Sequence, residues 1–142
     1  MSDNPVVHFE MGYEDAARAT KFYNSVFGWN MRNMGEEMGG YVVAQTADTD
    51  ENGMVQTKGA INGGFYKKTD DPLSQAPSIV VSVADIHAAV KAVEEAGGKI
   101  LGGKDLAGNH TMEPQMIPGV GLWISVMDTE NNRFSLLQAN AG

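Results

Sequence analysis

Apolar and polar residues follow one order twice along this chain, first near its N-terminus and again in its second half. Residues 6–11 and 78–83 are short, rich in β-branched side chains and partly alternating in polarity, which predicts a strand in each. Each segment leads to an aspartate, Asp15 or Asp85, that suits the N-cap of a helix. Apolar residues then recur at helical spacing up to a glycine. The pattern predicts a strand and an amphipathic helix in each half of the chain.

The apolar stripe of each predicted helix identifies the side that should pack on a sheet. In the first helix, which should end at Gly28, the stripe consists of Ala16, Ala19, Phe22, Tyr23, Val26 and Phe27. In the second helix, which should end at Gly97 and Gly98, it consists of Ile86, Ala89, Val90 and Val93.

Further strands are expected after each helix. They cover residues 41–45, 55–57, 59–68, 99–101, 121–127 and 133–138. In segment 121–127, alternation predicts one face toward the helix, made of Leu122, Ile124 and Val126, and an opposite face made of Trp123, Ser125 and Met127.

A polar segment near the middle of the chain separates the two copies of the pattern. Residues 69–77 combine prolines, aspartates, a serine and a glutamine, which is typical of a connection. We therefore expect a first module at residues 1–70, a linker at 71–77 and a second module at 78–142. Together they should form one domain of the α+β class.

Composition narrows the classes of function. The 142 residues suit one domain, or two small modules that share a core. The net charge of −8 disfavours nucleic acid and anionic membrane surfaces as partners, and no apolar run is long enough to span a bilayer. The absence of cysteine excludes disulfides, thiol nucleophiles and cysteine metal ligands. The N-terminal residues lack the features of a signal peptide, and we expect a cytoplasmic protein.

Several motifs resemble a known family. The most specific are the Phe22-Tyr23 pair before Gly28 and the closing segment 128–137, with its Asp-x-x-x-Asn-Arg pattern. The resemblance also includes His8, the remainder of segment 18–29, and segments 60–65, 78–85, 96–98 and 118–121. On these residues, which span nearly the whole chain, the protein is identified as a member of the vicinal oxygen chelate superfamily, the glyoxalase, bleomycin-resistance and extradiol dioxygenase group. The resemblance implies two tandem βαβββ modules whose curved sheets surround a central cleft, often in a homodimer.

The resemblance also implies where a metal would bind. In metal-dependent members of the family, four inward side chains, usually His or Glu, bind a divalent ion in the cleft. The corresponding positions are His8, a residue within 62–64, Ser78 and Ser135. His8 alone clearly matches, since metalloenzymes commonly have His and Glu at the two serine positions. Hydroxyl and amide oxygens are neutral and neutralise no charge of a divalent cation, so we expect neither a metal nor another cofactor.

Two interpretations of the remaining polar residues stay open. His8 and Glu10 lie on one face of a predicted strand, where Glu10 could orient His8 as a general base near neutral pH; alternatively, the two form an inert structural pair. Trp123 offers a surface for a flat or apolar ligand, or it fills the core or a dimer interface. The candidate ligand-binding residues are His8, Asn62, Ser78, Trp123, Ser125 and Ser135, with His8 and Glu10 as candidate catalytic residues.

Three functions follow from these observations. The preferred one is a small-molecule binding protein of the glyoxalase and bleomycin-resistance type that lacks the family's metal. The second is a glyoxalase-like lyase or isomerase that uses His8 and Glu10, with or without a divalent metal. The third is a dimerising domain without catalytic activity. A small-molecule ligand and a homodimer are the partners that we expect, and whether the protein is an enzyme stays open.

Overall fold

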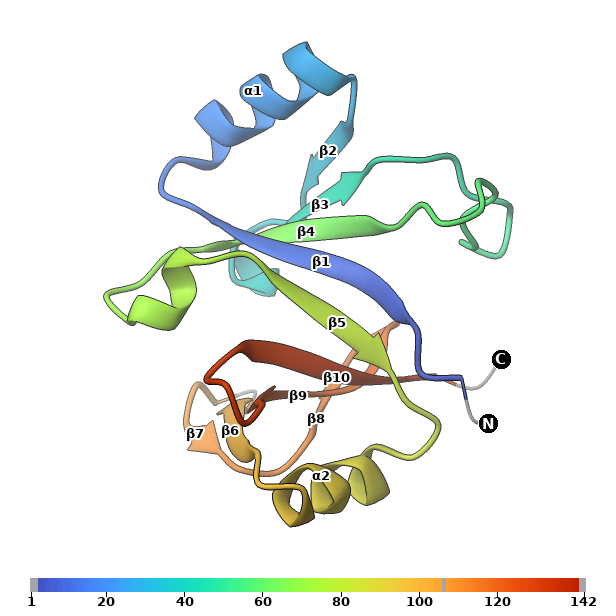
Figure 1. The fold of residues 1–142 in the computed structure, drawn as a ribbon. Coiled ribbons are helices and arrows are strands. Elements are labelled where there is room, and N and C mark those ends of the chain that lie inside the picture. Colours follow the sequence, from blue (N-terminus) through green and yellow to red (C-terminus); the bar gives the residue numbers. More distant parts are fainter. Residues whose placement is uncertain (1–2, 106, 141–142) are drawn as a thin grey trace. The chain divides into compact units, whose positions relative to one another are not determined.

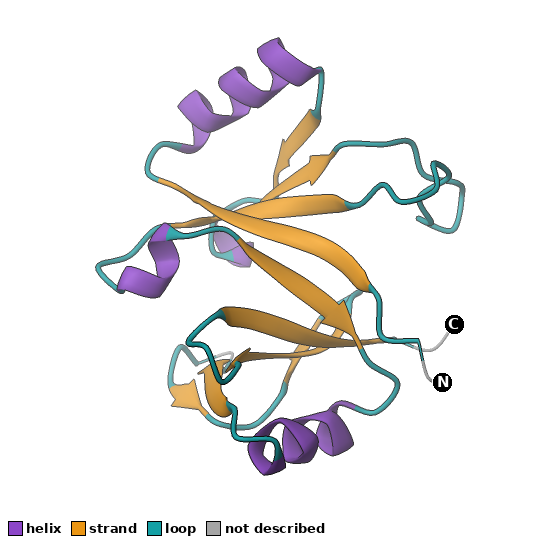
Figure 2. Cartoon of the chain, in the orientation of Figure 1, coloured by secondary structure: helices purple, strands orange, loops and turns teal. Residues whose placement is uncertain are grey.

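The computed structural model describes residues 3–105 and 107–140, and the chain divides into two compact units. The first unit is Val7–Ser78, and the second consists of Ile79 onward together with the residues before Val7. Residues 71–77, the expected linker, belong to the first unit, where Pro72–Gln75 form the short 3-10 helix η2. Each unit combines one α-helix with β-strands (Figure 2). The α+β class is therefore confirmed.

The first unit has the order βαβββ that the family resemblance implies (Figure 1). Its elements are β1 (Val6–Tyr13), α1 (Ala16–Phe27), β2 (Asn30–Asn33), the 3-10 helix η1 (Glu36–Met38), β3 (Val42–Gln45) and β4 (Asn62–Lys67). Within this unit the strand order is β2-β3-β4-β1. Strands β1 and β4 are parallel, whereas β3 is antiparallel to both β2 and β4.

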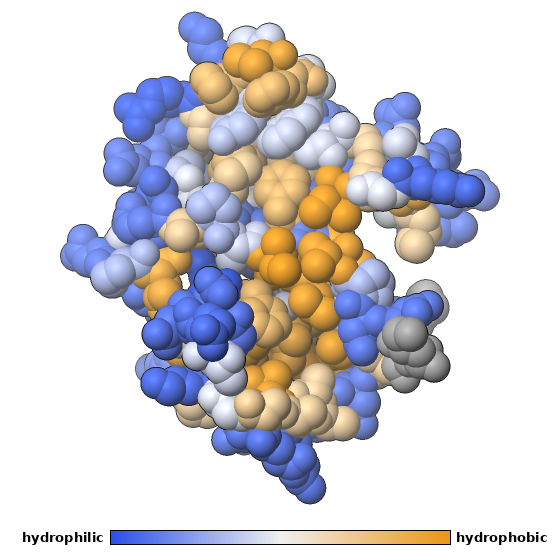
Figure 3. Space-filling view, in the orientation of Figure 1, coloured by the Kyte–Doolittle hydropathy of each residue, from blue (hydrophilic) through white to orange (hydrophobic). Residues whose placement is uncertain are grey.

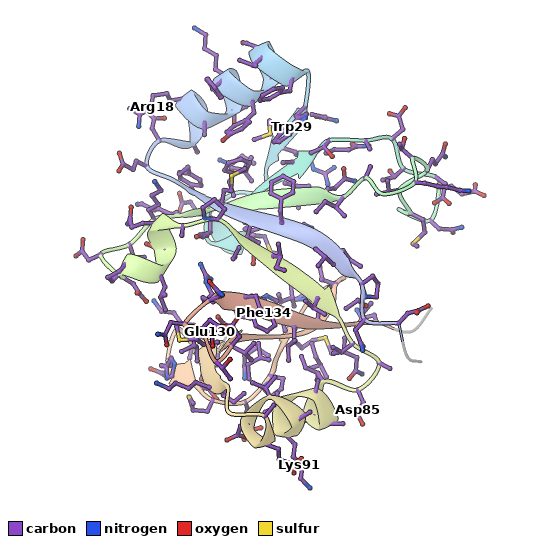
Figure 4. The ribbon with its side chains drawn as sticks, viewed as in Figure 1. Arg18, Trp29, Asp85, Lys91, Glu130 and Phe134 are labelled. Atoms are coloured by element: carbon purple, nitrogen blue, oxygen red, sulfur yellow. The ribbon has the colours of Figure 1, made fainter. Side chains whose placement is uncertain are left out.

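Helix α1 begins and ends where the sequence predicts. The Asp15 side chain accepts a hydrogen bond from the Arg18 N–H at 3.0 Å, which satisfies one of the unpaired donors of the first turn. Gly28 ends the helix in the left-handed conformation, with φ of 71°, and donates its N–H to the Asn24 carbonyl. Arg18 itself points away from the sheet (Figure 4), where it pairs with Glu14 in solvent.

The core of the first unit lies between helix α1 and its sheet. The buried residues Tyr13, Val42, Ala44 and Phe65 form its centre. Tyr23 joins helix to sheet, because its ring lies 4.9 Å from that of Phe65 on β4, measured between centroids. The Tyr23 ring also stacks on that of Trp29, with centroids 5.1 Å apart and an interplanar angle of 9°. Trp29 lies just after the end of α1 (Figure 4).

The exposed side of α1 corrects the predicted packing stripe. Phe22, Val26 and Phe27 are 55%, 55% and 59% exposed, whereas Ala16, Ala19 and Tyr23 pack against the core. The apolar arc of the helix is therefore wider than the face that its own sheet covers. Apolar surface is visible on the outside of α1 in the space-filling view (Figure 3).

The second unit repeats the strand-helix-strand order and adds two short strands. Its elements are β5 (Ser78–Ser82), α2 (Ile86–Glu95), β6 (Lys99–Lys104), β7 (His110–Thr111), β8 (Gln115–Ile117), β9 (Gly121–Met127) and β10 (Arg133–Ala139). The strand order within it is β5-β10-β9-β6-β7, and β8 pairs with β9. Strands β5, β6, β9 and β10 with α2 correspond to the second βαβββ module.

The core of the second unit confirms the predicted faces of its strands. The buried residues Ile86, Ile124, Val126 and Leu136 form the centre, and Leu122 packs against them. Asp85 caps α2 by accepting hydrogen bonds from the N–H groups of His87 and Ala88; Figure 4 shows Asp85 at the start of the helix. The predicted inward residues Ala89, Val90 and Val93 also contact this core.

The Asp-x-x-x-Asn motif builds the turn between β9 and β10. The Asp128 carboxylate accepts hydrogen bonds from the N–H groups of Glu130 and Asn132 and from the Asn132 side-chain amide, at 2.8 to 3.0 Å. These bonds, chiefly those from Asn132, lower the pKa of Asp128. Asn131 adopts a φ of 66°, a conformation that asparagine tolerates better than most residues. The motif thus fixes the pairing of the last two strands.

Two strand predictions were incomplete. Residues 55–57 form no strand of the sheet, and Val55 makes only an isolated β-bridge with Thr49. Strand β2, which consists mainly of polar residues, follows α1 without the alternation that the sequence pattern requires. Within the described ranges, no helix is long and apolar enough to cross a membrane.

Candidate functional site

Strand register in the first unit decides which residues lie beside His8 and Glu10. In the parallel pair β1–β4, His8 is opposite Asn62 and Glu10 is opposite Gly64. Partners in adjacent strands share a face of the sheet, so Asn62 lies on the same face as His8. Phe9 and Met11, the alternate residues of β1, pack into the core beneath α1. Of the three residues 62–64 that the family resemblance left open for the second metal-ligand position, the register thus places Asn62 and Gly64 on the face of His8, and Asn62 is the one with a side chain.

Tyr41 joins His8 to Glu10. Its phenol oxygen lies 2.9 Å from His8 Nε2 and donates a hydrogen bond to Glu10 Oε2 at 3.2 Å. The sequence pattern pairs His8 with Glu10 but does not indicate Tyr41, which is 33 positions from His8 and 31 from Glu10. The missed signal was alternation: Val42 and Ala44 face the core, which places Tyr41 on the face of His8 and Glu10.

Two neighbours hold the Tyr41 ring in place. A Cβ atom at Gly64 would overlap the phenol group, so the absence of a side chain there leaves the room that Tyr41 fills. On the preceding residue, the Gly40 carbonyl accepts a 2.7 Å hydrogen bond from the buried Tyr13 hydroxyl. The loop that carries Tyr41 is thereby tied to strand β1.

Burial sets the protonation states of this group. It lowers the pKa of His8 below its ordinary value of 6.5, so the imidazole is neutral at pH 7. It also raises the pKa of Tyr41 strongly, and the negative charge of Glu10 and the hydrogen bond to it act in the same direction. Tyr41 therefore keeps its proton, and the three side chains form a chain of hydrogen bonds with a neutral phenol at its centre.

The Asn62 side chain is hydrogen-bonded to the segment that follows β3. Its Oδ1 atom accepts hydrogen bonds from the backbone N–H groups of Thr46 and Ala47, at 2.7 and 3.1 Å, and from the Thr46 hydroxyl at 3.3 Å. These contacts fix the chain as it leaves β3. The carbonyl oxygen, which is the atom that a cation would need, is thus already occupied, and a ligand-binding role of the Asn62 amide stays a prediction.

In the second unit, Ser125 and Ser135 lie opposite each other on neighbouring strands β9 and β10. Both are buried, Ser135 completely, and the Ser135 hydroxyl has no hydrogen-bond partner within the described ranges. Trp123 follows on the same face of β9, as predicted. Its half-buried ring packs over Gly103, where a Cβ atom would lie 2.9 Å from a ring carbon.

Ser78, at the start of β5, is also buried, and its hydroxyl too has no partner among the described residues. Of the other histidines, His110 lies on the exposed strand β7, where its Nε2 atom contacts the Leu101 carbonyl at 2.8 Å. In residues 3–105 and 107–140, no three His, Asp or Glu side chains gather into a group that could hold a metal ion.

The comparisons with known proteins agree with this fold. Methylmalonyl-CoA epimerase in complex with methylmalonyl-CoA and NH4+ is 16% identical, with a TM-score of 0.67 over 99% of this chain and 97% of the other. A variant of the Streptomyces coelicolor epimerase in complex with 2-nitronate-propionyl-CoA is 15% identical, with a TM-score of 0.67 over 99% and 100%. A superfamily member from Vibrio splendidus is 15% identical, with a TM-score of 0.60 over 96% and 99%.

At these identities, the structural similarity establishes the fold and no more. No curated protein sequence matches the chain. The family model of the Glyoxalase/Bleomycin resistance protein/Dioxygenase superfamily, however, matches residues 6–136, which run from the first strand, β1, into the last, β10. The protein therefore belongs to this superfamily.

Proposed function

We propose that this protein binds a small organic ligand without the divalent metal of the family's metalloenzymes. The observation that carries the proposal is the buried Ser135 hydroxyl, which has no partner in the described part of the chain. A buried polar group without a hydrogen bond costs about 1–3 kcal/mol. A polar atom of a ligand that displaces the packing over Ser135 would remove this cost, while the ring of Trp123, on the same face of the neighbouring strand β9, offers an aromatic contact.

The chemistry of the side chains supports a site without metal. His8 offers one imidazole, but its Nε2 atom already contacts the Tyr41 hydroxyl. The Asn62 carbonyl is bonded to the chain after β3, and Ser78 and Ser135 are neutral hydroxyls. These four positions do not fit a divalent cation, which prefers imidazole nitrogen or charged oxygen ligands.

The test combines metal analysis with ligand screening. The protein purified with added nickel or zinc should retain no stoichiometric metal, and stoichiometric retention would overturn the metal-free proposal. In a thermal-shift screen of planar and aromatic metabolites and CoA esters, a ligand should raise the Tm of the wild type. The same ligand should raise the Tm of Ser135→Ala less. A screen without any stabilising compound would favour a dimerising domain without a ligand.

A second function, an isomerase that uses His8 and Glu10, is favoured by the chain from His8 through Tyr41 to Glu10. The solved epimerases that contain CoA esters support a CoA ester as the substrate to test. In this reaction a base removes the proton beside a carbonyl and returns it to the same carbon. Incubation with methylmalonyl-CoA in D2O should then replace that proton by deuterium, at a rate that His8→Ala abolishes. An unchanged NMR signal of that proton would exclude this substrate.

We further propose that the protein forms a homodimer, as the family resemblance implies. The supporting observation is the apolar outer face of α1, formed by Phe22, Val26 and Phe27, which are each more than half exposed. Large apolar side chains gathered on one exposed helix face are typical of surfaces that a partner covers. A second copy of the chain is the partner that we propose.

A further inference from the structure

The hydrogen bonds around Tyr41 decide which nitrogen of His8 carries a proton. A phenol has a single proton to donate, and Tyr41 donates it to Glu10 Oε2. The Tyr41 oxygen can therefore meet His8 Nε2, 2.9 Å away, only as an acceptor. The donor in that contact must be an N–H group at Nε2.

This assignment leaves the other ring nitrogen unprotonated. A neutral imidazole carries one N–H group, and its second nitrogen is an acceptor. Nε2 is the ring nitrogen with a hydrogen-bond partner among the described residues. Nδ1 thus keeps its lone pair, and it is the atom at which His8 can accept a proton or a hydrogen bond.

We propose that Tyr41 is a positioning residue that holds His8 in the Nε2–H tautomer, and that a ligand therefore meets Nδ1 as an acceptor. The partner that a histidine has at one ring nitrogen commonly sets the tautomer in this way. This inference rests on the proposed function and narrows its ligand class. The ligand carries a proton that Nδ1 can bind or remove, in an N–H, O–H or C–H group beside a carbonyl.

The surroundings of Tyr41 support a built arrangement. Gly64 leaves space for the phenol, since a Cβ atom at that position would overlap it. Tyr13 holds the residue before Tyr41 through its bond to the Gly40 carbonyl. Glu10 and His8 lie on the same face of β1, and both contact the hydroxyl oxygen of Tyr41. The orientation of the phenol is thus fixed by residues of strands β1 and β4 before any ligand binds.

NMR spectroscopy of the ligand-free protein tests the tautomer directly. Long-range ¹H–¹⁵N spectra of the wild type, with His8 signals assigned from His8→Gln, should show a protonated Nε2 and an unprotonated Nδ1. Tyr41→Phe removes the acceptor and should shift the His8 nitrogens toward a mixture of tautomers. The matched control is Tyr23→Phe, which removes a phenol hydroxyl on the α1 side of the sheet and should leave the His8 nitrogens unchanged.

Two results would overturn the inference. One is a wild-type His8 that carries its proton on Nδ1, and the other is a Tyr41→Phe variant with unchanged His8 nitrogens. In the deuterium exchange of methylmalonyl-CoA, Tyr41→Phe should lower kcat at least tenfold with little change in KM, whereas Tyr23→Phe should change neither. If the wild type exchanges no deuterium, the proposed isomerase function fails while the NMR result still decides the tautomer.

Discussion

The phenol of Tyr41 fills the space that a side chain at position 64 would need. A Cβ atom at Gly64 would overlap both the hydroxyl and the ring of Tyr41. Gly64 is also opposite Glu10 in the register of β1 and β4. Tyr41, just before β3, and Gly64 of β4 thus share the position beside Glu10, and the polar chain from His8 to Glu10 depends on both.

The substitution Gly64→Ala should therefore expel Tyr41 from its position. We expect the free energy of unfolding to fall by about 1–3 kcal/mol, as for other overpacked sites, measured by urea denaturation. In a Tyr41→Ala background the same substitution should cost much less, because the clashing ring is absent. Equal costs in the two backgrounds would show that the two residues do not compete for this space.

Asn62 offers a way to separate structure from ligand binding. Asn62→Ala leaves the N–H groups of Thr46 and Ala47 without their acceptor and should lower the free energy of unfolding by about 1–2 kcal/mol. Asn62→Asp keeps an acceptor oxygen and should retain most of that stability in urea denaturation. A similar loss in both variants would indicate that the amide nitrogen, rather than Oδ1, is the stabilising group.

The parts of the fold that could be predicted from the sequence depend on local chemistry. Asp15, Asp85 and Gly28 act within one helical turn, and the alternation along 121–127 is visible in consecutive residues. The role of Tyr41 could not be found in this way. It depends on the register of β1, β3 and β4, which brings together residues more than thirty positions apart.

The exposed face of α1 shows a second limit of the sequence pattern. Periodicity identifies every apolar residue on a helix, but it does not show how much of that arc a single sheet can cover. Here the sheet covers Tyr23 and leaves Phe22 and Phe27 exposed. Residues that suit a core and residues that suit a partner surface have the same polarity, so the sequence alone cannot separate them.

The buried His8 should make stability depend on pH in a defined direction. Its pKa is lowered in the folded state, so the unfolded chain binds a proton more readily below pH 6.5. The contribution of neutral His8 to stability is therefore complete above pH 6.5 and is lost as the pH falls toward the lower pKa of the folded state. Urea denaturation between pH 7.5 and 5 should show this decline.

The variant His8→Gln provides the control for this pH dependence. It lacks the titrating imidazole but keeps His87 and His110, so its stability should decline less over the same range. An identical decline in the wild type and in His8→Gln would assign the effect to other groups.

The apolar face of α1 gives a test of the homodimer. If a second copy covers this face, Phe27→Lys should place a charge in an apolar interface and shift the mass in sedimentation equilibrium from dimer toward monomer. Lys21→Glu, which also changes a charge on the exposed surface of α1, serves as the matched control and should leave the dimer largely intact. A dimer that Phe27→Lys does not weaken would place the interface elsewhere, and a monomeric wild type would contradict the homodimer.

Removal of the buried Ser135 hydroxyl should not lower the free energy of unfolding, whereas removal of a hydrogen-bonded serine hydroxyl should. Ser135→Ala removes a group that has no hydrogen-bond partner in the described ranges, so the free energy of unfolding of the ligand-free protein should stay unchanged or rise by up to about 1 kcal/mol. The control is Ser74→Ala, which removes bonds to the carbonyls of Thr69 and Asp71 and should lower the free energy of unfolding by about 1 kcal/mol.

Affinity for any ligand found in the thermal-shift screen, measured by calorimetry, should fall in Ser135→Ala and stay the same in Ser74→Ala. A loss of stability in Ser135→Ala as large as that in Ser74→Ala would show that the hydroxyl is already satisfied in the free protein, and it would remove the main support for a ligand at this position.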